Sequence, residues 1–267
     1  MISSSKSEKM LLALKDYKKR YLTKNLSELD ESGTRIMINT FLTSILGFQE
    51  LEEIKTEFMI KGTYADYIVQ IGGKRHFLVE VKAFSIDLSD KHLRQAVNYG
   101  ANEGIEWAVL TNGRHFQFYK IIFDKPISEK LVFEIDFTSE DYDIKAALAL
   151  LTYFHREAVL KNSFESLWAR YAALEPVGLA GLLFSPQVVT FLKKELKAKY
   201  DTKFEDDEIL EALTEVVCTE IPLDKLKIPK FKPVKKKVKV KIDKSVEGAI
   251  QTLKDNFVQQ VAAGETE

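Results

Sequence analysis

Between residues 53 and 137 the sequence repeatedly shows the alternation of apolar and polar residues that is typical of β-strands, and one helical segment interrupts it. The strand-like runs lie near residues 53–60, 63–71, 75–82, 106–111, 114–121 and 130–137. The helix is expected at about 89–103, and Gly72-Gly73 and Asn112-Gly113 mark turns between neighbouring runs. Because a helix separates the third run from the fourth, this order predicts an α/β fold with a mixed sheet rather than a β-sandwich.

Helical patterns flank the predicted sheet on both sides. Apolar positions recur at helical spacing over residues 6–22 and 34–47, and again from about 139 to 218. From Pro222 onward, prolines and lysines argue against a packed core, although a short helix is expected at 245–261. We therefore predict a sheet domain at 1–138, a small helical region at 139–220 and a basic, Lys- and Pro-rich linker or tail at 221–267.

Composition limits the class of protein further. A chain of 267 residues that is 45% hydrophobic can bury a core, and its single cysteine, Cys218, excludes a disulfide framework or a cysteine-rich zinc site. No apolar run approaches the roughly 18 to 20 residues that a membrane-spanning helix needs, and the first residues lack the apolar region of a signal peptide. We therefore expect a cytoplasmic protein that has no membrane partner.

Two opposite charges interrupt the apolar strand FLVEVKAF at residues 77–84. Because successive side chains of a strand point to opposite faces, Glu80 and Lys82 share one face. The preceding strand, TYADYIVQI, carries Asp66 in an equally apolar setting. Three charges therefore converge on two neighbouring strands, provided that the strands pair in the right register.

The loop between these two strands decides the register, because a slip of one residue turns every side chain to the other face. A two-residue loop at Gly72-Gly73 would place Asp66 opposite Val79, on the wrong face. A three-residue loop that also includes Lys74 would place Asp66 opposite Glu80. The hypothesis of a shared site therefore predicts the three-residue loop.

Two carboxylates beside an apolar core are costly unless positive charge lies between them. A divalent cation would supply that charge, because Asp66 and Glu80 offer the hard oxygen ligands that Mg²⁺ prefers, and the backbone carbonyl of Val81 could complete the protein side. Mn²⁺ could substitute for Mg²⁺. Lys82 could then orient or deprotonate a water bound to the metal, which suits hydrolysis of a phosphodiester bond. The alternative is a structural ion pair, since acidic-x-Lys triplets such as Asp143-Ile144-Lys145 also occur elsewhere in the chain.

The helix expected at 89–103 adds a further pair of candidate residues. Gln95 and Tyr99 are four residues apart, so they share a helix face directly after the charged strand. Such a pair could hydrogen-bond Lys82 or contact the backbone of a substrate. The alternative is that Gln95 is exposed and that Tyr99 belongs to the core.

Taken together, several of these segments resemble the PD-(D/E)XK nuclease superfamily. They are Asp66, Glu80-Val81-Lys82, Gln95-Ala96-Val97-Asn98-Tyr99 and WAVLTNGRHFQFYK at 107–120. Within the superfamily, the match is to the N-terminal nuclease domain of type I restriction enzyme R subunits and to related stand-alone, type IV-like restriction endonucleases. The stretch Glu31-Ser32-Gly33-Thr34-Arg35 resembles the opening segment of that domain, and the resemblance covers about residues 28–138.

The resemblance implies a mixed sheet of the restriction-endonuclease-like type and a Mg²⁺-dependent DNA endonuclease. It implies that Asp66 and Glu80 bind the metal and that Lys82 is the catalytic lysine. Gln95 matches a residue that assists in the active site, and Glu31 matches a helix carboxylate that often approaches the metal. The expected biological role is restriction or defence against foreign DNA.

The resemblance also bears on the partners of the chain. No GxxxxGK[ST] motif occurs, so we expect no ATP binding and a stand-alone endonuclease rather than a complete R subunit. DNA is the expected partner, with contacts from Tyr99, Lys235, Lys236 and Lys237, although the lysines could instead form a solvated linker. A homodimer would supply two active sites for the two strands. The competing interpretation is a catalytically silent nuclease fold that only binds a nucleic acid or a partner protein.

Overall fold

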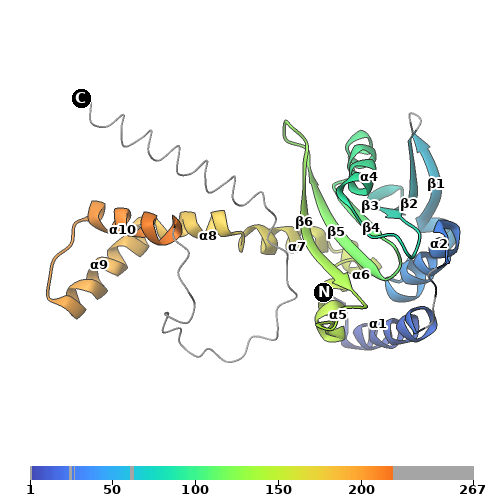
Figure 1. Ribbon diagram of the computed structural model, residues 1–267, viewed down its shortest axis with the longest axis horizontal. Helices are drawn as coiled ribbons and strands as arrows, with labels where there is room; N and C mark the ends of the chain where they lie inside the picture. Colours follow the sequence, from blue (N-terminus) through green and yellow to red (C-terminus); the bar gives the residue numbers. More distant parts are fainter. Residues whose placement is uncertain (1, 24–25, 27, 61–62, 219–267) are drawn as a thin grey trace. The chain divides into compact units, whose positions relative to one another are not determined.

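The computed structural model describes residues 2–23, 26, 28–60 and 63–218, and its first compact unit is built on a six-stranded sheet (Figure 1). The strands are β1 (Ile54–Ile60), β2 (Thr63–Ile71), β3 (Lys74–Val81), β4 (Trp107–Thr111), β5 (His115–Ile122) and β6 (Ser128–Asp136). They lie in this order across the sheet, with β3 and β4 parallel and the other neighbours antiparallel. Parallel neighbours need a crossover, and α4 (Asp90–Glu103) supplies it. The predicted α/β fold with a mixed sheet is confirmed.

Helix α4 covers one face of the sheet. The buried residues of this layer are Ala65, Ile68, Leu78, Leu93, Ala96, Val97, Tyr99, Ile105, Ala108, Leu110, Tyr119 and Ile121. Those on α4 recur every three or four residues, which gives the helix one apolar side. Gly104 adopts a left-handed conformation with φ 66° and ends the helix. This packing holds the N-terminal half of α4 beside the carboxyl end of β3, where the charged residues lie.

Aromatic side chains from several helices pack on the other face. The helices that precede the sheet are α1 (Ser4–Tyr17), α2 (Glu31–Thr40) and α3 (Glu50–Glu53), and single π-helical turns, η1 (Lys18–Leu22) and η2 (Phe41–Ile45), extend α1 and α2. Phe41 stacks on Phe116 of β5 with ring centroids 4.2 Å apart, and Tyr17 contacts the edge of Phe41 at 5.8 Å. These contacts anchor the C-terminal end of α2 on the sheet.

The hairpin between β2 and β3 reaches the predicted register by an unexpected route. Ile71 pairs with Lys74, so the loop has two residues, Gly72 and Gly73, and the three-residue loop is wrong. Both glycines have positive φ, at 57° and 81°, as such a tight turn requires. A bulge then inserts His76 into β3, since Gln70 pairs with Arg75 but Val69 pairs with Phe77.

The inserted residue, His76, brings Asp66 and Glu80 to the same face of the sheet, which the two-residue loop alone would not have done. Beyond the bulge, Tyr67 pairs with Val79, and the same register places Asp66 opposite Glu80. One extra residue on one strand turns all later side chains by one position, which is the same shift that a longer loop would have made. The predicted juxtaposition of the two carboxylates is therefore found, although its predicted cause was incorrect.

Helices follow β6 as far as the end of the described residues. They are α5 (Ile144–Leu151), α6 (Arg156–Val159), α7 (Ser163–Ala172), α8 (Pro176–Leu183), α9 (Pro186–Tyr200) and α10 (Asp206–Cys218). The first compact unit extends to Trp168, whereas the sequence pattern led us to place the sheet domain at 1–138. Phe154 packs on Phe77 of β3 at 5.3 Å, and Phe164 stacks on Trp107 of β4 at 5.1 Å. The sheet core therefore includes side chains from α7 and from the segment before α6.

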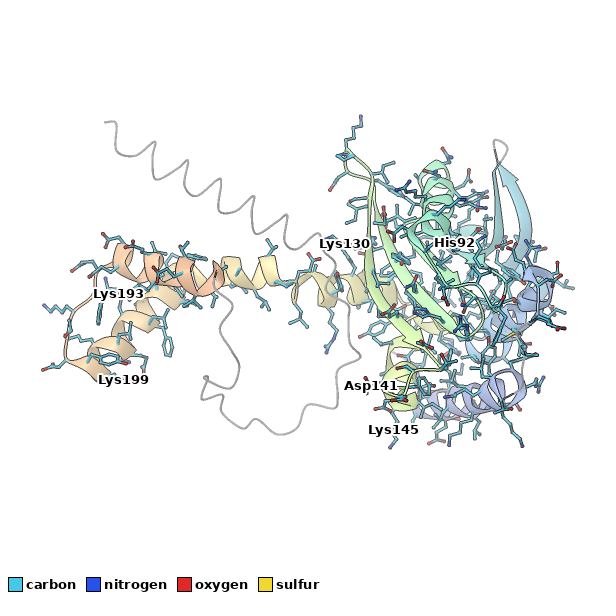
Figure 2. All side chains as sticks on the ribbon, in the orientation of Figure 1. His92, Lys130, Asp141, Lys145, Lys193 and Lys199 are labelled. Carbon is cyan, nitrogen blue, oxygen red and sulfur yellow. The ribbon has the colours of Figure 1, made fainter. Side chains whose placement is uncertain are left out.

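The second compact unit, from Ala169 onward, has its own small core. Val189, Ile209 and Leu213 are buried between α9 and α10. Lys193, which Figure 2 labels on α9, donates to Asp206 on α10 at 2.5 Å. None of the described helices alone has the length and apolar composition of a membrane span, whereas α8 and α9, bent by 59°, meet those criteria only as a pair. The Lys- and Pro-rich segment, with Lys235, Lys236 and Lys237, lies outside the described residues.

Candidate active site

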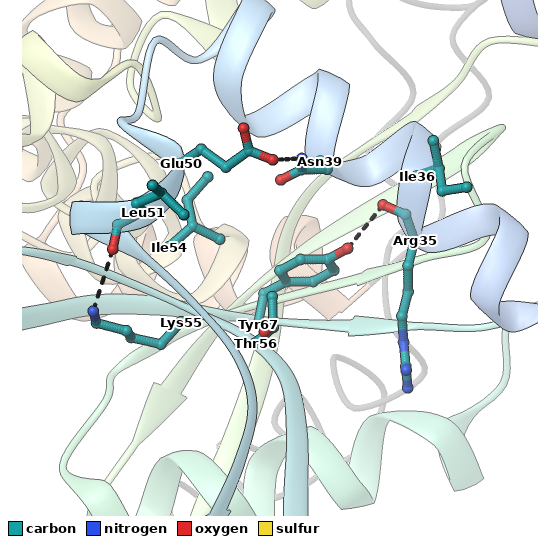
Figure 3. A pocket seen from close by; sticks show the side chains of 9 residues that line it. All are labelled: Arg35, Ile36, Asn39, Glu50, Leu51, Ile54, Lys55, Thr56 and Tyr67. Carbon is teal, nitrogen blue, oxygen red and sulfur yellow. Dashed lines mark hydrogen bonds between the residues drawn. The ribbon is translucent and has the colours of Figure 1, made fainter.

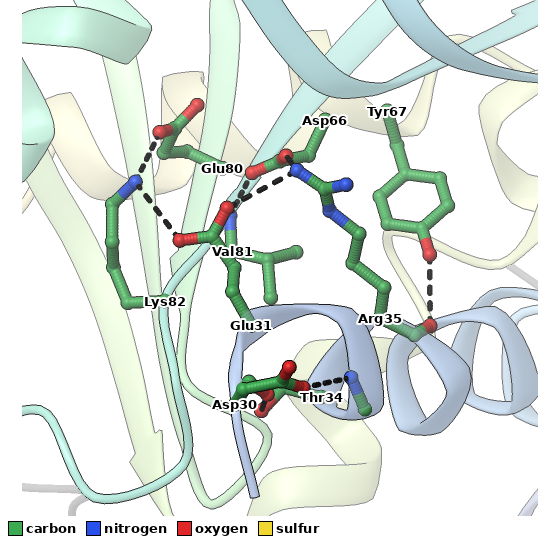
Figure 4. A network of polar contacts seen from close by, with 10 residues as sticks. Asp30, Glu31, Thr34, Arg35, Asp66, Tyr67, Glu80, Val81 and Lys82 are labelled. Atoms are coloured by element: carbon green, nitrogen blue, oxygen red, sulfur yellow. Dashed lines mark hydrogen bonds and ion pairs between the residues drawn. The ribbon is translucent and has the colours of Figure 1, made fainter.

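The N-terminus of α2 brings two charged side chains to the end of β2 and β3. Asp30 caps the helix, because its Oδ1 accepts a hydrogen bond from the backbone N–H of Gly33 at 2.8 Å. The helix therefore begins at Glu31, where its dipole favours a carboxylate. Arg35 lies one turn further on the same side, donating to Glu31 Oε1 at 3.1 Å and to Asp66 Oδ1 (Figure 4).

The strands contribute the remaining charges of the cluster. Lys82 Nζ donates to Glu80 Oε1 at 2.5 Å and lies 3.9 Å from Glu31 Oε2. Asp66 Oδ2 accepts from the backbone N–H of Val81 at 2.7 Å, which ties the end of β2 to the end of β3. The structure thus brings together Asp66, Glu80 and Lys82 as the shared-face hypothesis predicted, and Glu31 joins them from α2 (Figure 4). We refer to Glu31, Arg35, Asp66, Glu80 and Lys82 as the carboxylate cluster.

Burial dominates the electrostatics of this cluster. Glu80 is 1% exposed and Asp66 is 7% exposed. Burial raises the pKa of Glu80 to about 7; the hydrogen bond from Lys82 opposes this rise, and the nearby negative charges of Asp66 and Glu31 add to it. A carboxyl group with this pKa exchanges its proton near neutral pH, unlike a solvated glutamate.

The charge balance and the donor atoms fit a divalent cation. Three carboxylates face two cationic side chains, so the cluster carries excess negative charge when its members are ionised. Among the described residues, no three His, Cys, Asp or Glu side chains are grouped so that they could hold a metal by themselves. Mg²⁺ does not require three, because it usually keeps several waters and takes one or two protein carboxylates. Asp66 and Glu80 would supply those two, beside the backbone of Val81.

A comparison with known families identifies the segment that contains this cluster. Residues 30–132 match the family model of the type I restriction enzyme R protein N terminus. This segment is similar to the N-terminal domain of a restriction enzyme. It runs from the capping residue of α2 into β6, so it includes every member of the carboxylate cluster. Neither the curated proteins nor the solved structures gave a significant match to the chain.

Within this segment, the predicted pair on α4 divides between surface and core. Gln95 is exposed in the first half of the helix, on the side of the sheet that carries Glu80. Tyr99 is 1% exposed and belongs to the apolar layer under α4. A side chain so buried offers no surface to DNA, so the predicted contact from Tyr99 is wrong and the core alternative holds. Lys235, Lys236 and Lys237 fall in the segment outside the described residues.

Sequence reasoning missed one member of the carboxylate cluster, Arg35, and one residue near it, His92. Arg35 belongs to the segment that resembles the opening of the family domain. Its bond to Asp66 joins residues that are 31 apart in sequence, so no local pattern predicts it. Its spacing of four residues from Glu31 was the one sequence signal of a contact. His92 at the start of α4 lies close enough for Lys82 to act on it. Burial lowers the pKa of His92, and the charges of Lys82 and Lys91 lower it further. The domain therefore surrounds Lys82 with more titratable groups than the motif alone predicts.

A neighbouring cleft is separate from the cluster. It has a volume of about 590 Å³ and lies between α2, α3, β1 and β2 (Figure 3). Its lining residues are Arg35, Ile36, Asn39, Glu50, Leu51, Ile54, Lys55, Thr56 and Tyr67. Tyr67 donates to the carbonyl of Arg35 at 2.8 Å and points to the face of β2 opposite Asp66. The cleft thus shares only Arg35 with the carboxylate cluster.

Proposed function

We propose that this domain is a Mg²⁺-dependent nuclease that hydrolyses phosphodiester bonds of DNA. The observation that carries the proposal is the meeting of Asp66, Glu80 and Lys82 at the ends of two paired strands, inside a segment that matches a restriction-enzyme family. A buried cluster with excess negative charge is costly for folding alone, and such costs are typical of functional sites.

In this proposal, Asp66, Glu80 and the carbonyl of Val81 hold the cation. The cation, when bound, supplies positive charge beside the phosphate and lowers the pKa of a water molecule. Lys82 donates a hydrogen bond to a water or a phosphate oxygen next to Glu80, because its amine already lies within hydrogen-bonding distance of that carboxylate. Mn²⁺ is expected to replace Mg²⁺, since it also accepts oxygen ligands.

The remaining polar residues orient this arrangement. Arg35 donates to Asp66 and Glu31 together, so it fixes the position of Asp66 and offsets part of the excess charge. Gln95 is exposed on the helix beside β3 and is proposed to assist from that side by hydrogen bonding to Lys82 or to the substrate. The sequence contains no GxxxxGK[ST] motif, and in this proposal cleavage proceeds without ATP.

The family description supports the proposed substrate, whereas the proposed assembly rests on the two strands of a DNA duplex. A restriction-enzyme N-terminal domain suggests DNA as the partner, and restriction of foreign DNA as the setting. Cleavage of both strands of a duplex needs two reactive centres, which a homodimer would provide.

A catalytically silent fold is the second candidate. Each buried strand carboxylate already has a cationic partner, Arg35 for Asp66 and Lys82 for Glu80, and the same ion pairs would stabilise a domain that only binds. The two candidates differ in what a divalent cation does. In the nuclease the cation enables cleavage, whereas in the silent fold it changes nothing.

The test is cleavage of supercoiled plasmid, linear duplex and single-stranded DNA by the purified full chain with Mg²⁺, with Mn²⁺ and with EDTA. Lys82→Met is the variant at the cluster. Lys145→Met is the matched control, because Asp143-Ile144-Lys145 repeats the acidic-x-Lys spacing with an exposed lysine on α5. Cation-dependent cleavage that Lys82→Met abolishes and Lys145→Met retains supports the nuclease. No cleavage of any of these DNAs with either cation overturns it.

A further inference from the structure

The turn between β4 and β5 is held rigid by its own side chains. Thr111 Oγ1 accepts from the N–H of Gly113 at 3.0 Å and donates to the carbonyl of His115 at 2.8 Å. Asn112 Oδ1 accepts from the backbone N–H groups of Arg114 and His115, at 3.2 and 2.9 Å. Thr111 is 0% exposed and Asn112 is 1% exposed. Buried side chains that satisfy backbone groups in this way fix a turn in one conformation.

This turn is hydrogen-bonded to Lys82 and to the segment that follows it. The carbonyl of Thr111 accepts from the backbone N–H of Lys82 at 2.8 Å. Asn112 Nδ2 donates to the carbonyl of Ile86 at 2.8 Å, and Arg114 Nε donates to the carbonyl of Phe84 at 3.1 Å. Three hydrogen bonds from this turn thus hold the backbone of residues 82–86, which follows the end of β3.

Apolar packing does little to hold this segment. Residues 85–87 are exposed, and Lys82 and Phe84 are only partly buried. Exposed segments with few apolar contacts open easily unless hydrogen bonds secure them. The bonds from Asn112 and Arg114 therefore determine where the segment after Lys82 lies.

The same segment and the same turn also contact α2. The N–H of Phe84 donates to the carbonyl of Leu29, which immediately precedes the capping residue of α2, at 3.2 Å. Gly113 has φ 84°, and a Cβ on it would lie 2.9 Å from Met37 Cε of α2. The turn, the segment after Lys82 and the start of α2 thus form one connected unit, which carries Lys82 and Glu31.

We propose that Asn112 and Arg114 are positioning residues that hold the Lys82 amine between Glu80 and Glu31. This inference rests on the proposed nuclease function, because only that function gives Lys82 a catalytic role. The position of the Lys82 amine can nevertheless be measured without any cleavage. Neither residue touches the carboxylate cluster in the bonds described above; each acts through backbone carbonyls of residues 84–86. Arg114 also donates to Asp87 at 2.8 Å, but Asp87 is 94% exposed, so this ion pair contributes little.

The test measures the accessibility of Lys82 in the metal-free full chain. Reductive methylation, followed by mass spectrometry of individual lysines, reports how freely each amine reacts. Lys120 is the internal control, because it is 8% exposed and its amine bonds to Glu106 at 2.5 Å on the same sheet. The variants are Arg114→Ala, Arg114→Lys and Asn112→Asp, which keeps the acceptor oxygen of the turn but loses the donor to Ile86. Asp87→Ala is the matched control.

We expect Arg114→Ala and Asn112→Asp to raise the methylation rate of Lys82 severalfold while that of Lys120 stays at the parent value. Arg114→Lys should give an intermediate rate, since an amine can reach one carbonyl without the fixed guanidinium geometry. Asp87→Ala should behave as the parent. With DNA and Mg²⁺, cleavage by Arg114→Ala should fall by roughly 10- to 100-fold, as expected when a supporting contact is lost.

Two outcomes overturn the inference. In one, Lys82 and Lys120 become more reactive together, which means general loosening of the domain. In the other, Lys82 reacts as in the parent in every variant. If the parent cleaves no DNA but the lysine pattern appears, the nuclease function fails and the positioning of Lys82 stands. If Arg114→Ala does not fold, Asn112→Asp and Arg114→Lys decide the result.

Discussion

Two buried glutamates in the first compact unit both have cationic partners, but their pKa values are shifted in opposite directions. Glu53, at the end of α3, is 4% exposed and accepts from Arg156 Nε through both carboxylate oxygens at 2.8 Å. Burial alone would raise the pKa of Glu53, but hydrogen bonds from Arg156 and from the backbone N–H of Gln49 lower it overall. The pKa of Glu80, by contrast, is raised to about 7.

The difference comes from the number of carboxylates that share each cation. Arg156 contacts Glu53 through Nε and Nη2, in a fork-like arrangement that engages both carboxylate oxygens. Glu80 shares its surroundings with Asp66 and Glu31, and the charges of both raise its pKa. A pair that balances its own charge needs no further ligand and serves the fold. A cluster with surplus negative charge lacks that balance, and this is why we propose that it binds a cation.

The largest expected effect is on DNA cleavage, which should depend on Glu80 and not on Glu53. Glu80→Gln should reduce Mg²⁺-dependent DNA cleavage by several orders of magnitude, since it removes a proposed metal ligand. Glu53→Gln should retain cleavage at temperatures where the variant is folded, because Glu53 lies in another part of the sheet domain. Initial rates at saturating Mg²⁺, together with circular dichroism to confirm folding, measure both. Equal losses in the two variants would mean that Glu80 and Glu53 do not differ in their role in cleavage.

The second prediction concerns stability, for which Glu53 is expected to matter more than Glu80. Glu53→Ala should lower the free energy of unfolding by about 1–3 kcal/mol, because it leaves the partly buried Arg156 and the N–H of Gln49 without their acceptor. Glu80→Gln in EDTA at pH 8 should leave that free energy unchanged or raise it, since the substitution removes a buried charge from a crowded cluster. Urea unfolding followed by tryptophan fluorescence gives both values. A drop of similar size for Glu80→Gln would make that residue a structural partner of Lys82.

Most of the arrangement behind these predictions was readable in the sequence. The alternation of residues 53–137 predicted the strands and α4, because period-two and helical patterns record which face is buried. It also placed Glu80 and Lys82 on one face. Three features escaped. The His76 bulge has no residue signature of its own, and the Arg35–Asp66 and Glu53–Arg156 contacts join residues 31 and 103 apart, which only the folded sheet brings together.

A third prediction uses pH to sharpen the comparison at Glu53. Its folded pKa is lower than the ordinary value of 4.5, so its contribution to stability is fully present above that value and is lost as pH falls through the folded pKa. The difference in unfolding free energy between the parent and Glu53→Gln should therefore be largest at neutral pH and should shrink below about pH 4. Urea titrations at several pH values measure it. A difference that grows as the pH falls would mean that the Arg156 contact does not favour the ionised carboxylate.

The smallest expected effect concerns Glu31, the least buried carboxylate of the cluster. Its side chain is 41% exposed, and its Oε2 lies 3.9 Å from the Lys82 amine, too far for a hydrogen bond. Glu31→Gln should therefore reduce cleavage by no more than about tenfold and change the metal-free unfolding free energy by less than roughly 0.5 kcal/mol. Because Gln keeps an oxygen for Arg35, the substitution removes charge and little else. Its clearest consequence should be weaker Mg²⁺ binding, seen as a higher cation concentration for half-maximal cleavage. If Glu31→Gln lost as much activity as Glu80→Gln, then Glu31 would be a metal ligand of equal weight, and the cluster would bind its cation through three carboxylates rather than two.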